Sequence, residues 1–91
     1  MNPEFQKRRR EFYRELGLNI ARQRKEAGLT QEKLAERIDI SKDYLGHIEA
    51  ENCEVYPSLE ILLRISGALG VPLELLFPLS FPFPPYFDKT T

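Results

Sequence analysis

The chain has 91 residues, of which 42% are hydrophobic and 30% charged, and its formal net charge is -1. These proportions are typical of one globular domain; they exclude a disordered or fibrous protein, and the length leaves no room for a second catalytic or ligand-sensing domain. Because no apolar run is long enough to span a bilayer or to act as a signal peptide, we expect a cytoplasmic, nucleoid-associated protein.

The first predicted element is helical and ends at Ala27. Pro3 is suited to a first helical turn, and Gly28 is suited to the left-handed residue that follows a helix. Gly17 is the only residue between them that disfavours a helix, by about 1 kcal/mol. The pattern therefore fits either one long helix or two short ones.

Basic side chains are concentrated in this first element. Residues 1–25 hold eight basic and three acidic side chains, whereas residues 26–60 hold three basic and nine acidic ones. Such asymmetry indicates a phosphate-binding face, with a solvated helix surface as the alternative. We expect this face to include the run Lys7, Arg8, Arg9 and Arg10, either on a helical extension or on a flexible arm.

Two short helices joined by a tight turn are predicted next. Thr30 and Ser41 are good N-caps, because their hydroxyls can accept hydrogen bonds from the free amides of a first helical turn. The apolar residues that follow the two caps at helical spacing are Leu34, Ala35, Ile38, Tyr44, Leu45 and Ile48. The unit from Thr30 to Glu49 therefore has the spacing of a helix-turn-helix.

The remaining chain predicts two further helices and an extended arm. Ser58 caps a fourth helix that ends at Gly70, and Pro72 begins a fifth. We expect Leu59 and Leu62 to face the core, which leaves other apolar side chains of the fourth helix exposed and indicates a homodimer. The residues predicted at the dimer interface are Ile61, Ile65, Phe77, Phe81, Phe83, Tyr86 and Phe87. The alternative is that the arm, residues 78–91, folds back on its own domain.

Four motifs occur in order along the chain: RxxxGLTQxxLA from Arg24, ISxxYLxxIE from Ile40, PSLxxLLRI from Pro57 and ALGV from Ala68. With them, residues 14–77 resemble the lambda-repressor and Cro-like (XRE) helix-turn-helix family. The resemblance implies an all-α, five-helix domain, often dimeric, whose third helix reads operator DNA. Residues 1–13 would then be a basic N-terminal extension of that domain.

The resemblance also implies roles for individual residues. Lys42, Asp43 and His47 fall on base-reading positions, although a solvated lysine, a first-turn acid and an exposed helix residue are the alternatives. Tyr44 falls on a position that contacts the DNA backbone or a thymine methyl group, with core packing as the alternative. Gln31 would bind a phosphate, or be an ordinary helix former.

One residue pair matches a structural feature of the family, and two places differ from the family pattern. Arg24 and Glu49 match a pair that joins the first helix to the end of the third. Asp39 stands where the turn usually has glycine, but aspartate tolerates the left-handed region better than most residues. The loop after the third helix is longer than usual and carries Glu51 and Glu54.

No enzymatic chemistry is indicated by the sequence. One histidine and one cysteine, Cys53, provide no nucleophile and base at plausible spacing, and a lone cysteine cannot form an intrachain disulfide or a cysteine-based metal site. We therefore expect no cofactor, no metal and no small-molecule ligand. The predicted function is a DNA-binding transcriptional regulator acting as a homodimer on double-stranded operator DNA; the alternative is a protein-interaction adaptor or antitoxin-like module.

Overall fold

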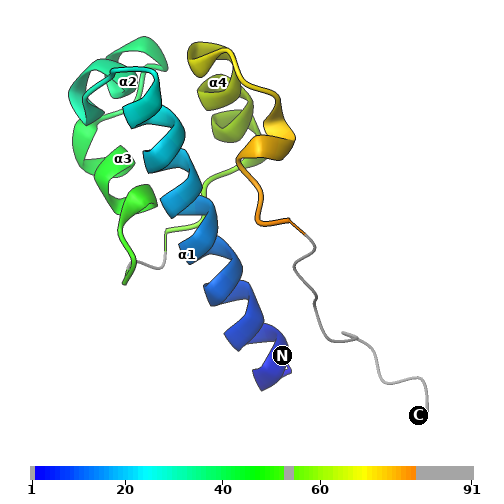
Figure 1. Cartoon of the computed structure of the whole chain (residues 1–91). Coiled ribbons are helices and arrows are strands. Elements are labelled where there is room, and N and C mark those ends of the chain that lie inside the picture. Colours follow the sequence, from blue (N-terminus) through cyan, green and yellow to red (C-terminus); the bar gives the residue numbers. More distant parts are fainter. Residues whose placement is uncertain (1, 53–54, 80–91) are drawn as a thin grey trace.

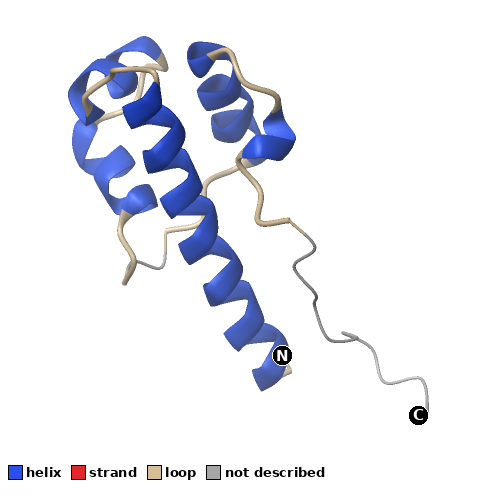
Figure 2. Cartoon of the chain, in the orientation of Figure 1, coloured by secondary structure: helices blue, strands red, loops and turns tan. Residues whose placement is uncertain are grey.

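The computed structural model describes residues 2–52 and 55–79, and these ranges contain helices and loops but no strand (Figures 1 and 2). The predicted all-α class is confirmed. The fifth helix, however, is a single 3-10 turn rather than an α-helix. The elements in chain order are α1 (Pro3–Glu26), α2 (Gln31–Arg37), α3 (Lys42–Glu49), α4 (Leu59–Leu69) and the turn η1 (Leu73–Leu75).

α1 is one continuous helix of 24 residues, in which Gly17 causes no break. The side chain of Asn2 caps it by accepting hydrogen bonds from the amides of Glu4 and Phe5, at 2.8 and 3.2 Å. Its N-terminal turns extend beyond the other helices (Figure 1). The basic segment is therefore a helical extension and not a flexible arm.

The predicted caps of the three shorter helices are confirmed. The hydroxyls of Thr30, Ser41 and Ser58 each accept a hydrogen bond from an amide in the following turn, at 3.0 to 3.2 Å. Asp39 adopts the left-handed conformation expected for it, with φ 59°. Gly70 ends α4 in the same conformation, with φ 67°. Local chemistry therefore fixes the boundaries of the helix-turn-helix.

The core lies where α1, α2, α3 and α4 meet. α1 contributes Leu16 and Ile20, which are almost completely buried, and the predicted apolar stripes of α2 and α3 face them. The core is completed from the C-terminal side by Leu76, directly after η1. The fully or nearly buried hydrophobic residues are Leu16, Ile20, Leu34, Ala35, Ile38, Leu45, Ile48, Leu62, Ile65 and Leu76.

The predicted orientation of α4 is partly wrong. Ile65, predicted at a dimer interface, has no exposed surface, whereas Leu59, predicted in the core, is 61% exposed. Leu62 and Ile65 are three residues apart and share the inward face. Leu59 is the first residue of α4 and is exposed at that end of the helix. Ile61 is half-buried against the core. The exposed apolar side chains of α4 are therefore Leu59 and Leu63.

The chain after η1 packs back onto α1. The ring of Phe77 lies 6.0 Å from that of Phe12, between centroids, and Phe77 is half-buried against the core. For Phe77, docking on its own domain therefore fits the structure better than a role only at a dimer interface. The other aromatic residues predicted at the interface, Phe81, Phe83, Tyr86 and Phe87, lie outside the described residues.

Candidate nucleic-acid interface

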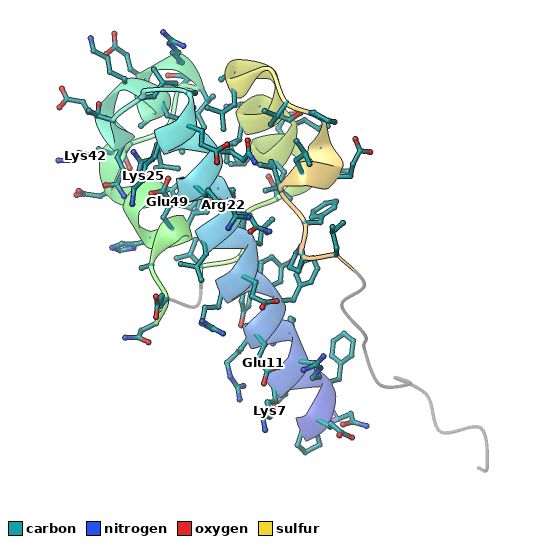
Figure 3. The ribbon with its side chains drawn as sticks, in the orientation of Figure 1. Lys7, Glu11, Arg22, Lys25, Lys42 and Glu49 are labelled. Atoms are coloured by element: carbon teal, nitrogen blue, oxygen red, sulfur yellow. The ribbon has the colours of Figure 1, made fainter. Side chains whose placement is uncertain are left out.

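α3 presents one polar face to solvent. Lys42, Asp43 and His47 are exposed on it, whereas Leu45 and Ile48 point into the core. Tyr44 is half-buried and packs against the core, so core packing, the alternative role given for it, accounts for part of its side chain. The three predicted base-reading residues therefore share a surface that can approach another molecule, and in Figure 3 Lys42 projects away from the helices.

A buried ion pair holds the end of α3 against α1, as predicted. Nε and Nη2 of Arg24 each donate to a carboxylate oxygen of Glu49 at 2.9 Å, and Nη1 donates to the carbonyl of Leu29 at 2.8 Å. The two residues are 7% and 8% exposed. Such bidentate geometry fixes orientation as well as distance. The pair therefore sets the position of α3 relative to α1.

Gln31 joins this network at the start of α2. Its Nε2 donates to Oε1 of Glu49 at 2.9 Å, so both short helices are tied to the same carboxylate. The contact was not foreseen from the sequence, because it links residues 18 positions apart. The phosphate-binding role of Gln31 stays a prediction, whereas the positioning contact is present in the structure.

Gly17 lets α1 and the end of α3 approach closely. A Cβ atom at this position would overlap the carbonyl oxygen of Ile48 and lie 3.3 Å from the Cα of Glu49. Any larger side chain would therefore push the two helices apart. The sequence indicated only the weak helix propensity of glycine here, and not its packing role.

The basic run of α1 divides into two groups. Arg8 forms an ion pair with Glu11 at 2.6 Å, and the guanidinium of Arg9 lies 5.0 Å from the ring centroid of Tyr56. Lys7 and Arg10 are exposed. Consecutive helical residues point in different directions, so a run of four cations cannot form one face.

A hollow of about 360 Å³ lies between α1 and the loop after α3. Lys7 and Arg10 line it from α1 together with Arg14, which sequence reasoning did not select. The spacing of these three residues in the sequence could have indicated the group, because residues at i, i+3 and i+7 share a helical face. The loop contributes Glu51, Asn52 and Tyr56, and Glu11 completes the lining. Cys53 and Glu54 of the same loop lie outside the described residues.

The described part of the chain lacks two kinds of feature. No group of three or more histidine, cysteine, aspartate or glutamate side chains could hold a metal ion there. No helix in it is long and apolar enough to cross a membrane.

The sequence is similar to one known family and to several known proteins. Residues 20–76 match the family described as Helix-turn-helix. The immunity repressor protein of Bacillus phage phi105 is 39% identical over 61 residues, which are 67% of this chain and 41% of the repressor. The HTH-type transcriptional regulator SinR of Bacillus subtilis is 36% identical over 61 residues, which are 67% of this chain and 54% of SinR. The chain thus matches about half the length of these relatives.

Solved structures of helix-turn-helix proteins have a similar fold. The restriction-modification controller protein C.AhdI from Aeromonas hydrophila superposes with a TM-score of 0.66 at 28% identity, covering 71% of this chain and 96% of that one. SinR, the master regulator for biofilm formation, solved in complex with DNA, gives a TM-score of 0.62 at 36% identity over 67% of this chain and 95% of that one. The structure of SinR in its complex with SinI gives a TM-score of 0.61 at 36% identity, and the match covers 67% of this chain and 58% of that one.

Proposed function

Because the chain belongs to the helix-turn-helix family, we propose that it is a transcriptional regulator that binds double-stranded DNA sequence-specifically through α3. The observation that carries the proposal is the exposed face of Lys42, Asp43 and His47 on a helix that the Arg24–Glu49 pair holds in place. The complex of SinR with DNA supports it, since that relative shares the fold.

The chemistry of this face suits base edges in the major groove. The groove is about 12 Å wide and admits one α-helix, and α3 is short enough to enter it without bending. Lys42 can donate to the acceptors of guanine, and Asp43 can accept from the amino group of cytosine. His47 can do either, depending on which ring nitrogen carries the proton. Gln31 and Tyr44 would contact the adjacent backbone.

We propose that the regulator acts as a homodimer on a pseudo-palindromic operator. A two-fold dimer places two recognition helices about 34 to 36 Å apart, which is one turn of DNA. The exposed Leu59 and Leu63 of α4 supply apolar surface for such contact. In this proposal residues 14–77 form the DNA-binding domain, the activity is binding without catalysis, and the site of action is the cytoplasm and its nucleoid.

The test begins with selection of a preferred duplex from a random-sequence pool. On that duplex, Lys42→Ala and His47→Ala should each weaken binding by about 1 to 3 kcal/mol, with a smaller loss on mixed-sequence duplex. The control is Arg37→Ala, which removes a cation at the far end of α2. Equal losses on all sequences would show that neither residue reads bases, and failure to select any duplex would contradict the proposal.

A protein-interaction adaptor is the second candidate function. The surface of α2 and the following turn carries the exposed acids Glu32, Glu36 and Asp39, which do not favour a polyanionic ligand. The complex of SinR with SinI supports this candidate, since a relative with this fold is found with a protein partner. Titration with duplex DNA at two salt concentrations separates the candidates, because phosphate contacts make affinity fall steeply as salt rises.

A further inference from the structure

We propose that Lys7, Arg10 and Arg14 form a phosphate-binding ridge on α1, here named the α1 ridge, which contacts the DNA backbone beside the groove that α3 enters. The inference rests on the proposed function and deepens it. It assigns a second DNA-contacting surface outside the helix-turn-helix, and it replaces the four-residue basic run with three residues that share one face.

The helix geometry aligns the three cations. Their spacing of three and then four residues places them in one row, and the row extends about 10 Å along the axis. All three line the hollow whose other wall is the loop after α3, including Asn52 and Tyr56. In Figure 3 Lys7 lies beside the N-terminal part of α1, below the other helices, and Lys42 lies on α3 at the far left. The loop that lines the hollow begins directly after Glu49, the last residue of α3, so the hollow adjoins the C-terminal end of the recognition helix.

The ridge carries charge that the described part of the chain does not neutralise. Lys7, Arg10 and Arg14 are exposed, and none of them forms an ion pair with a described residue. By contrast Arg24 and Arg64 have carboxylate partners. Glu11, which also lines the hollow, is already paired with Arg8 at 2.6 Å. Glu51 is thus the one remaining carboxylate of the lining, opposite three cations.

Packing fixes the ridge relative to the recognition helix. Tyr56 lies in the loop after α3. The centroid of its ring is 4.5 Å from the ring centroid of Tyr13 and 5.0 Å from the guanidinium carbon of Arg9. One turn further along α1, Gly17 meets the backbone at the end of α3. A helix held at these points presents its cations at a constant position, and so it adds phosphate contacts without the ordering entropy of a flexible arm.

The lining favours a phosphate backbone over an acidic protein. Stable protein interfaces have an apolar core with aromatic or aliphatic anchors, whereas this hollow is lined by charged and amide side chains with Tyr56 as its single ring. Duplex DNA presents one negative charge per about 1.7 Å of axis, so a row of three cations can meet several phosphates. We therefore commit to duplex DNA as the ligand.

The test is the salt dependence of binding to a mixed-sequence duplex of about 30 base pairs, compared between full-length variants. Arg10→Gln with Arg14→Gln should flatten the slope of log K against log salt by about 1.8, because each lost phosphate contact contributes about 0.9. Between 50 and 200 mM salt, the affinity ratio of wild type to variant should therefore shrink about tenfold. Both arginines are exposed, so thermal unfolding should be nearly unchanged.

The control with the same change in net charge is Arg37→Gln with Arg64→Gln, at the end of α2 and on α4. Because Arg64 is paired with Glu60 and donates to the carbonyl of Ile38, thermal unfolding of this control is measured alongside its DNA binding. This control should keep the wild-type slope. An unchanged slope in the ridge variant would overturn the proposal and point to an acidic protein as ligand. An equal change of slope in both variants would also overturn it, because the change would then follow from net charge and not from the position of the cations. Absence of any salt-dependent binding by wild type would instead contradict the proposed function itself.

Discussion

The two halves of α1 belong to one continuous helix but have different surroundings. In residues 15–26, Leu16 and Ile20 are buried in the core and Arg24 is buried in its ion pair. In residues 3–14 no side chain is fully buried, and the helix is supported by ring contacts of Phe12 and Tyr13. Helical continuity therefore does not imply uniform packing. One half positions α3, and the other carries cations to the surface.

This difference has an energetic consequence. Segments with few buried apolar contacts open locally at a lower free energy than the core to which they are attached. We expect amides of residues 5–13 to exchange with solvent faster than those of residues 17–24. Substitutions in the two halves should accordingly differ in how far their effects spread, and three of them sharpen the comparison.

The largest effect is expected at the ion pair in the C-terminal half. Arg24→Ala leaves the carboxylate of Glu49 buried without its cation, which should lower the free energy of unfolding by about 3 to 5 kcal/mol. Denaturant unfolding measures the loss. As a control, Arg24→Met combined with Glu49→Met removes both charges and should recover much of the stability. A double variant as unstable as Arg24→Ala would show that packing, and not the unpaired charge, dominates.

An intermediate effect is expected at Gly17, near the start of the C-terminal half. Gly17→Ala gains helix propensity but forces the new methyl group against the backbone of Ile48, so we expect a net loss of about 2 kcal/mol. Gly67→Ala in α4 is the matched control, because nothing lies within 4 Å of the added Cβ, and it should stabilise by about 1 kcal/mol or less. Thermal unfolding of both variants gives the comparison. A stabilised Gly17→Ala would contradict the close approach.

The smallest effect is expected for the loop contacts that support the N-terminal half. Tyr56→Ala removes the ring that contacts Tyr13 and Arg9, and the loss should be about 1 to 2 kcal/mol. Hydrogen exchange should show it as faster opening of residues 5–13, with the core of α2 to α4 unchanged. Tyr56→Phe keeps the ring and should behave like wild type. Faster exchange throughout the chain would mean that the two halves are not independent.

Local chemistry explains why so much of the fold could be predicted. The caps at Thr30, Ser41 and Ser58 act within one helical turn, and Asp39 meets a conformational demand of its own backbone. Such interactions can be seen in any short window of sequence. The ion pair of Arg24 and Glu49 is not local, and its prediction depended on the resemblance to a known family.

The candidate site was predictable only in outline. Exposure of Lys42, Asp43 and His47 follows from the helical period of α3, and the structure agrees. The ridge residue Arg14 was missed because the basic run drew attention to consecutive positions, whereas a helix groups residues three and four apart. The rotation of α4 was misjudged because its apolar residues occupy several faces, so that the pattern alone does not select one.

The amino-acid sequence by itself determined the helices, their caps, the helix-turn-helix spacing and the excess of basic side chains near the N-terminus, because each depends on neighbouring residues. The tertiary structure alone decided which side of α4 is buried, why Gly17 must lack a side chain, and which cations remain exposed beside the loop after α3. These outcomes depend on contacts between residues far apart in the chain. A contact of that kind exists only after the helices have packed.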